Sequence, residues 1–207
     1  MDHIDAIFYI NLDSRPDRKE HFLKEIPKLC TDLTKLHRIN AIPDPIGIIG
    51  CSKSHILAVE TFLANPEWNT CIIFEDDFTF FNQDISYNNQ TLRDVMTNFI
   101  KWDCIMLSIS KWNKQLANTH MHTIKRVIEG QAASGYVLTR DFAPILLNTL
   151  KEGLDKLIET TNIPLYANDM YWKKLQPSHH WYTTVPALGY QYANYSNISQ
   201  KNMDYGC

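Results

Sequence analysis

The stretch "NTCIIFEDDFTFF", residues 69–81, decides the fold class of this chain. Its first half is a short run of β-branched and aromatic residues, which is typical of a buried strand. Three consecutive carboxylates, Glu75, Asp76 and Asp77, follow that run directly. Because side chains alternate between the two faces of an extended segment, we expect Glu75 and Asp77 on one face and Asp76 on the other. The stretch therefore predicts a buried strand with a cluster of negative charge at its carboxyl end.

Strands and helices are expected to alternate on either side of this stretch. Short apolar runs predict further strands at residues 6–12, 35–41, 103–109, 122–129 and 134–139. Apolar residues at helical spacing predict helices from Pro16 onward and at residues 52–64, 91–102 and 140–150, with Ser14 and Ser52 as N-caps. This alternation predicts an α/β sandwich with a mostly parallel sheet. In such sheets ligands bind beyond the carboxyl ends of the strands, which is where the three carboxylates are expected.

Composition narrows the class of protein. The chain has 207 residues, of which 44% are hydrophobic, and this is enough for one sizeable core, so we expect a single domain over residues 1–207. A formal net charge of -3 offers no basic surface for nucleic acid. No run of about 18 apolar residues exists, so we expect no membrane span.

The cysteines indicate a reducing compartment. They are odd in number and widely spread, and none forms a CxxC pair: Cys30, Cys51, Cys71, Cys104 and Cys207. We therefore expect free thiols rather than a disulfide framework. The N-terminal residues also lack the pattern of a signal peptide, so the expected location is cytoplasmic.

The carboxylate trio has the chemistry of a cation site. Two carboxylates on one face at a strand end suit a divalent cation, which prefers oxygen ligands and leaves positions open for phosphates and water. Without a cation, their mutual repulsion would raise one of the two pKa values. The alternative is a solvated acidic turn, which explains poorly why the trio lies between two apolar runs.

Two arginines lie around the first turn of the first predicted helix. Arg15 and Arg18 oppose the helix dipole there, at a cost of roughly 0.3–1 kcal/mol per charge. A bound anion would reverse that sign, because a helix start with basic side chains is a phosphate site. The alternative is that Asp17 and Glu20 neutralise them locally.

A glycine-containing segment, "PIGIIGCSKSH" at residues 45–55, precedes another predicted helix. It is neither a Walker loop nor a GxGxxG motif. If the helix begins at Ser52, His55 lies in its first turn, where the dipole would keep the imidazole neutral and able to hydrogen-bond a ligand. The alternative is a structural histidine with partners inside the protein.

The order of these pieces resembles a known family. "FYINLDSRPDR", "GIIGCSKSH", "IIFEDD" and "AASGYVLTR" occur in the order seen in family 25 of the glycosyltransferases, which includes bacterial lipooligosaccharide galactosyltransferases and the collagen galactosyltransferases. The resemblance runs from about Ile7 to Gln191. Its most specific parts are INLxxRxDR, GCxxSH and EDD.

The resemblance implies a GT-A-type (Rossmann-like) three-layer sandwich, a nucleotide-sugar donor, usually UDP-galactose, and manganese as the cofactor. EDD stands where GT-A enzymes keep a DxD motif, which implies metal binding by Asp77 and Glu75, with Glu75 on the ribose or on a metal-bound water. Ile48 and Ile49 stand where many relatives carry a glutamate, which leaves the donor sugar open. The matched motifs imply the following donor-binding residues: Asn11, Leu12, Arg15, Arg18, Gly50, Ser54, His55, Glu75, Gly135 and Gln191.

The function predicted from this resemblance is a metal-dependent, inverting glycosyltransferase. It would move a hexose, galactose or glucose, from a UDP-sugar to a hydroxyl of a glycan, lipooligosaccharide or protein acceptor, as a galactosyltransferase of lipopolysaccharide biosynthesis does. The alternatives are a non-catalytic GT-A-like domain for sugar-nucleotide binding or assembly, and a sugar-nucleotide hydrolase.

An inverting transfer needs a general base for the acceptor hydroxyl. The segment "NIPLYANDMYWKKL", residues 162–175, resembles the family's segment in which an aspartate enters a helix, and Asp169 is therefore the predicted base, with Asp76 as the next candidate. Tyr166, Tyr171 and Trp172 surround Asp169 in sequence and would offer aromatic faces to a sugar. The alternative is that Asn168 and Asp169 only cap the helix, with Met170, Trp172 and Leu175 facing partly inward.

Overall fold

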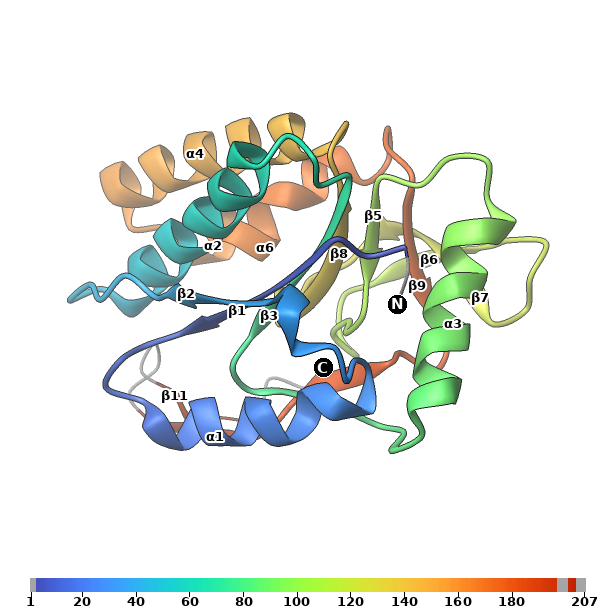
Figure 1. Cartoon of the computed structure of the whole chain (residues 1–207). Helices are drawn as coiled ribbons and strands as arrows, with labels where there is room; N and C mark the ends of the chain where they lie inside the picture. The colour runs from blue at the N-terminus through green and yellow to red at the C-terminus, as the bar shows by residue number, and fades with distance from the viewer. Residues whose placement is uncertain (1–2, 197–200, 204–207) are drawn as a thin grey trace.

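The computed structural model describes residues 3–196 and 201–203, and its centre is an eight-stranded sheet (Figure 1). Six of the eight strands run in one direction, and β7 and β8 run against them. The predicted α/β sandwich with a mostly parallel sheet is confirmed. In spatial order the strands are β2 (Leu36–Asn40), β1 (Ala6–Asn11), β3 (Thr70–Glu75), β8 (Gly135–Thr139), β5 (Cys104–Met106), β9 (Trp181–Thr184), β7 (Ile124–Glu129) and β6 (Gln115–Asn118).

Helices cover both faces of this sheet and make three layers, with α2, α4 and α6 on one side and α1 and α3 on the other (Figure 1). Short 3-10 turns occupy Ile26–Lys28, Leu33–Lys35 and Trp172–Leu175. The α-helices are α1 (Pro16–Glu25), α2 (Gly47–Ala64), α3 (Ile85–Asn98), α4 (Ala143–Thr160), α5 (Ile163–Tyr166) and α6 (Asn168–Tyr171).

Two hydrophobic cores follow from the alternation of side chains along the strands. In β1, Phe8 joins the core beneath α2 and α4, whereas its neighbour Ile7 joins the core against α1 and α3. In β3, Ile73 and Ile72 divide in the same way. Both faces of the central strands are therefore buried, which explains why these strands read as continuous apolar runs.

A two-stranded ribbon of β4 (Phe78–Phe80) and β10 (Gly189–Gln191) lies beyond the carboxyl end of β3. Asp76 and Asp77 form the tight turn between β3 and β4, and Phe78 and Phe80 of β4 join the core on the α1 and α3 side of the sheet. The antiparallel register pairs Gln191 with Phe78 and so brings the C-terminal part of the chain next to the carboxylates. A second small ribbon joins β11 (Asn194–Ser196) to β12 (Lys201–Met203).

The predicted start of α2 is wrong. The helix begins at Gly47 rather than near Ser52, and Ser52 is not its cap but lies inside it, with its hydroxyl bonded to the carbonyl of Ile48 at 3.0 Å. Glycine disfavours helix formation, so Gly47 and Gly50 should weaken the first turn of α2. Ile48 and Ile49 are buried against Leu157, and this packing keeps the segment helical.

Other expected boundaries also shift. The N-cap position of α1 is Arg15 rather than Ser14, and no side chain caps it. α3 begins earlier than predicted because Asp84 caps it by accepting a hydrogen bond from Ser86 N at 2.8 Å. No helix of the described part of the chain has the length and apolar character that a membrane crossing requires. Within the same part the cysteines are free thiols, at Cys30, Cys51, Cys71 and Cys104.

Candidate functional site

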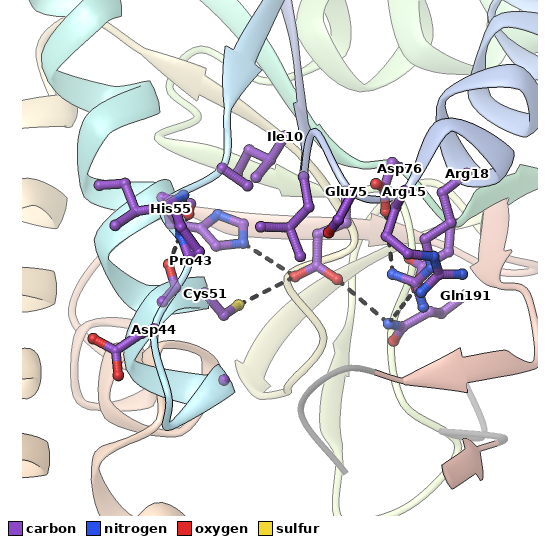
Figure 2. Close-up of a pocket in the computed structure, with 18 of the residues that line it drawn as sticks. Ile10, Arg15, Arg18, Pro43, Asp44, Cys51, His55, Glu75, Asp76 and Gln191 are labelled. Carbon is purple, nitrogen blue, oxygen red and sulfur yellow. Dashed lines mark hydrogen bonds and ion pairs between the residues drawn. The ribbon is translucent and has the colours of Figure 1, made fainter. Parts of the chain in front are cut away.

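A pocket of about 400 Å³ lies at the carboxyl ends of β1 and β3 (Figure 2). The end of β1, the start of α1, the loop before α2, one face of α2 and the carboxylate trio form its walls. The predicted site residues that line it are Leu12, Arg15, Arg18, Gly50, Ser54, His55, Glu75, Asp76, Asp77 and Gln191.

Glu75, the last residue of β3, lies between two groups of side chains in this pocket, as Figure 2 shows. One of its oxygens is 3.1 Å from Nε2 of His55 and 3.8 Å from Sγ of Cys51, and the other accepts a hydrogen bond from Gln191 Nε2 at 3.3 Å. Burial alone would raise the pKa of Glu75, but the hydrogen bond and charge of His55 and the charge of Arg18 outweigh it, and the net shift is downward. Glu75 is therefore an ionised carboxylate at neutral pH.

Asp77 is almost fully buried, and one of its oxygens lacks a partner. Its Oδ2 accepts a hydrogen bond from Gln191 Nε2 at 3.2 Å and lies 3.0 Å from the guanidinium of Arg18. Its Oδ1 is buried and has no hydrogen-bond partner among the described residues. Burial, followed by the charges of Glu75 and Asp76, raises the pKa of Asp77 to about 7, with Arg18 opposing the shift.

A buried carboxylate oxygen without a partner costs free energy, on the order of 1–3 kcal/mol or more. A divalent cation held by Asp77 and Glu75 would supply the missing partner and remove the repulsion between the two carboxylates. The two side chains converge on one amide, that of Gln191, so they are close enough to share a ligand. The oxygen atoms of Glu75 and Asp77 therefore fit a hard divalent cation such as manganese or magnesium.

Asp76 is held differently. Asn11 Nδ2 donates a hydrogen bond to it at 2.6 Å, and Arg18 lies 3.1 Å from its other oxygen. Asn11 is outside the pocket lining, and its own side-chain oxygen accepts a hydrogen bond from Arg38 at 2.8 Å. Burial raises the pKa of Asp76, and the charge of Arg18 opposes that shift. Asn11 therefore acts from behind the pocket, by fixing Asp76.

The two arginines of α1 differ in their partners. Arg15 pairs with Asp17 at 2.7 Å, so the local neutralisation considered from the sequence occurs for this residue. Glu20 instead pairs with Lys24, and Arg18 reaches across to Asp76 and Asp77. Both arginines line the pocket beside the start of α1, where an anion would meet helix N–H groups as well as the two side chains.

His55 is not in the first turn of its helix, so the dipole argument for its neutral state fails. The early start of α2 places His55 in the helix interior, where its Nδ1 lies 3.1 Å from the hydroxyl of Tyr136 and its Nε2 contacts Glu75. Partners inside the protein therefore satisfy the ring, as the structural alternative required, while the ring still lines the pocket.

Gly50 and Ser54 shape the pocket wall. Ser54 Oγ accepts a hydrogen bond from the backbone N–H of Ile42 at 2.8 Å and donates one to the carbonyl of Gly50 at 2.7 Å. A Cβ atom at Gly50 would lie 2.5 Å from the carbonyl oxygen of Ile42. Only glycine allows the loop before α2 to approach the helix this closely.

Gly135 lies outside the pocket lining. It is buried in β8, and a Cβ atom there would lie 2.7 Å from the ring of Phe78. Its place explains the glycine by packing, because it makes room for the aromatic residue that follows the trio. The donor-binding role implied by the resemblance remains a prediction for this residue.

Asp169 lies in the first turn of α6, but it does not cap that helix. The N-cap position is Ala167, and no side chain makes a capping hydrogen bond, so the capping alternative for Asn168 and Asp169 is wrong. Burial, followed by the charge of Glu75, raises the pKa of Asp169 to about 6, with Lys173 opposing. Asp169 is outside the pocket lining yet near enough to feel the charge of Glu75.

Trp172 and Tyr171, two of the three aromatic residues near Asp169, do not offer open faces for a sugar. Trp172 is fully buried in the main core, where it packs edge-on against Trp181. The hydroxyl of Tyr171 donates a hydrogen bond to Glu152 at 2.6 Å on the outside of α4. The expected acceptor platform is therefore wrong for Trp172, whereas the inward orientation that the alternative gave to Trp172 and Leu175 is confirmed.

Cys51 is a pocket residue that the sequence interpretation did not place in the site. It precedes His55 by one helical turn and lies on the same face of α2. The spacing of four residues between Cys51 and His55 is the sequence signal that could have placed Cys51 in the site. Burial and the nearby charges of Glu75, Asp169 and Asp77 raise the pKa of the Cys51 thiol. The loop residues Ile42, Pro43 and Asp44 also line the pocket and were not predicted.

No family model and no curated protein matches this chain. Among solved structures, the chain is similar to A197 from STIV, with a TM-score of 0.51 and 11% identity, covering 97% of this chain and 93% of that one. It is also similar to a glycosyltransferase involved in the glycosylation of the major capsid of PBCV-1, with a TM-score of 0.51 and 10% identity, covering 85% of this chain and 79% of that one. The GT-A-type fold class is confirmed by this likeness, which at such low identity concerns the fold alone.

Proposed function

We propose that this chain is a metal-dependent glycosyltransferase that moves a hexose from a UDP-sugar to an acceptor hydroxyl. The observation that carries the proposal is the buried, unpartnered Oδ1 of Asp77 beside Glu75, at a pocket of about 400 Å³. That volume is within the usual range for small-molecule sites, about 300–1,000 Å³. The fold shared with a solved glycosyltransferase and the ordered EDD, SH and RxDR motifs support the same reaction class.

The residues of the pocket divide into two roles toward the donor. Glu75 and Asp77 would hold a divalent cation, manganese by the resemblance, which when bound neutralises the leaving diphosphate as a Lewis acid. Arg15 and Arg18 place positive charge at the start of α1, where phosphate oxygens would be bound. Gln191 fixes the two carboxylates relative to one another through its amide.

Asp169 is the proposed base of an inverting transfer. A carboxylate with a pKa of about 6 remains ionised at pH 7 yet accepts a proton more readily than an ordinary aspartate. Asp76 is the second candidate, but Asn11 and Arg18 both engage its oxygens, which makes it less available to an acceptor. The donor hexose proposed is galactose or glucose, and the acceptor is a glycan, a lipooligosaccharide or a protein hydroxyl.

A thermal-shift titration tests the donor and metal part of this proposal. UDP, UDP-galactose and UDP-glucose are compared with and without manganese, and each ligand at a hundredfold excess over its dissociation constant should stabilise the fold by about 2.7 kcal/mol. Asp77→Asn should remove the manganese-dependent part. Asp103→Asn is the matched control, because Asp103 is also buried but accepts its hydrogen bond from His180 N outside the pocket.

Product analysis separates the rival functions. A transferase gives UDP and a glycoside of inverted anomeric configuration, only when an acceptor is present. A hydrolase releases UDP and free hexose without an acceptor, and a non-catalytic domain binds the donor and releases neither. A parent protein that shows no manganese-dependent shift with any of the three nucleotides would overturn the proposal.

A further inference from the structure

One cluster in the pocket combines a thiol, an imidazole and a carboxylate, which is a different ligand set from the carboxylate pair of Glu75 and Asp77. Sγ of Cys51, a ring nitrogen of His55 and a carboxylate oxygen of Glu75 all lie within 4.8 Å of one another. Cys51 and His55 are four residues apart on one face of α2, and Figure 2 shows both directed at Glu75 on the neighbouring β3. We propose that these three side chains form a binding site for Zn²⁺.

Two of the three distances between the ligand atoms are close to those of a tetrahedral zinc site. Oε1 of Glu75 is 3.1 Å from Nε2 of His55 and 3.8 Å from Sγ of Cys51. Around a tetrahedral zinc ion, sulfur, nitrogen and oxygen ligands lie roughly 3.3–3.6 Å from one another. Shifts of a few tenths of an ångström would bring these two contacts to the tetrahedral values, and the sulfur and the ring nitrogen lie within 4.8 Å of each other. A mixture of S, N and O ligands favours zinc over manganese or magnesium, which prefer oxygen throughout.

Side chains behind the cluster support two of the ligands. The hydroxyl of Tyr136, from β8, lies 3.1 Å from Nδ1 of His55, and it accepts a hydrogen bond from that nitrogen when Nε2 binds a metal. The amide of Asn168, from α6, donates to the sulfur of Cys51 at 4.0 Å. Zinc-bound histidines are oriented by such contacts at the second ring nitrogen.

Charge and access also favour a dication at this place. Cys51 lines the pocket, so an ion can reach the cluster from solvent. The thiol lies in the field of three carboxylates, Glu75, Asp77 and Asp169. The competing interpretation is that His55 and Glu75 form only a structural hydrogen bond and that Cys51 is a bystander. That interpretation gives Cys51 no part in metal binding, which a substitution can test.

Glu75 belongs to both ligand sets, with Oε1 toward His55 and Cys51 and Oε2 toward Gln191. A zinc ion bound to one oxygen would lower the affinity of the other for the donor metal, because the two dications repel each other at this distance. Zinc should therefore inhibit hexose transfer, and Cys51→Ser should relieve the inhibition. This consequence rests on the proposed function, whereas zinc binding itself does not. The binding experiment can accordingly be read without any activity.

Cobalt is the probe for the binding experiment, because a thiolate ligand gives Co²⁺ an intense charge-transfer absorption. Zinc has no such absorption, so displacement of cobalt by zinc is followed as a loss of signal. Every protein carries Cys207→Ser, so that the terminal thiol contributes nothing. We expect the absorption in the parent, its loss in Cys51→Ser, and a cobalt affinity at least about a hundredfold weaker in that variant. Cys30→Ser is the matched control: Cys30 is buried, and its thiol donates to the carbonyl of Asp32 at 3.3 Å outside the pocket.

The absorption should persist in Asp77→Asn, which removes the response to manganese instead. A parent without thiolate absorption at saturating cobalt, or a Cys51→Ser variant with unchanged absorption, would overturn the zinc site. If cobalt binds through Cys51 while manganese and UDP-sugars produce no shift, the zinc site stands and the proposed function fails. Zinc inhibition that is equally strong in Cys51→Ser would show that zinc acts elsewhere and would remove the proposed competition.

Discussion

Replacing Arg18 by methionine should destabilise the fold more than any change at the neighbouring Arg15. The guanidinium of Arg18 lies 3.1 Å from Asp76 and 3.0 Å from Asp77, whose side chains are only 7% and 1% exposed, and its own side chain is 16% exposed. Removing one partner of a buried ion pair costs about 3–5 kcal/mol, because the other charge stays buried without compensation. Since Arg18 retains some solvent contact, we take the lower end, about 3 kcal/mol.

For a chain of this length, a loss of about 3 kcal/mol corresponds to a fall in Tm of roughly 6–12 °C, at about 2–4 °C per kcal/mol. The assay is thermal or urea unfolding of Arg18→Met, with Arg15→Met as the matched control. Arg15 pairs with an aspartate that is 63% exposed, and exposed pairs contribute about 0–1 kcal/mol, so the control should melt within a few degrees of the parent.

A double-mutant cycle identifies the cause of the loss. Asp77→Asn removes one of the charges that Arg18 compensates, so Arg18→Met should cost less in the Asp77→Asn background, with a coupling energy in the range of about 0.5–3 kcal/mol. Manganese should also raise the Tm of Arg18→Met, since the cation replaces the lost positive charge. If Arg18→Met melts within about 2 °C of the parent, or if the two arginine variants lose equal stability, the role assigned to the buried ion pair is refuted.

Two further predictions concern Gly135 and Asp169, whose roles the sequence leaves open. Gly135→Ala should lower the free energy of unfolding in urea by about 1–3 kcal/mol, because the added Cβ would lie 2.7 Å from Phe78. Its affinity for UDP, measured by calorimetry, should be unchanged, and weaker UDP binding by the folded variant would support a donor-binding role. Asp169→Asn should reduce transfer at least about a hundredfold with unchanged UDP affinity, and transfer by the parent should fall as the pH drops below about 6, where the base becomes protonated. Because the folded-state pKa of Asp169 is raised above 3.8, ionisation of this residue destabilises the fold as the pH rises through about 6. Asp169→Asn should therefore melt no lower than the parent at pH 8. Transfer by this variant within a few-fold of the parent would exclude Asp169 as the base.

The parts of the fold that the sequence predicts well are those in which local pattern and final environment agree. β1 and β3 are buried on both faces, so their continuous apolar runs identify them directly. The carboxylates after β3 could be placed at a strand end for the same reason. The helix α1 can also be predicted from the sequence, because Pro16 in its first turn is a local signal of a helix start.

The errors arise where distant residues decide the outcome. The two glycines before Cys51 indicate a turn by their own propensity, but contacts of Ile48 and Ile49 with Leu157 of α4 hold them in α2. The argument that the helix dipole keeps His55 neutral is wrong for the same reason, because it required α2 to begin near Ser52. Of the two interpretations of Trp172, the exposed aromatic surface is wrong and the inward orientation is confirmed, because the residue packs against the distant Trp181. Gln191 could be assigned to the site only through the family resemblance, since nothing local brings it to the carboxylates.

The place of β8 in the sheet has a consequence for the order of folding. β8 lies between β3 and β5, antiparallel to both, so it is the strand that joins the two halves of the sheet. While the chain emerges from the ribosome, the edge of β3 has no such partner until residues 135–139 have been synthesised, and the apolar strand "TCIIFE" is exposed to other chains. A truncation before Gly135 should therefore aggregate rather than fold as an independent half. Productive folding of the deciding stretch thus depends on a strand made about sixty residues later.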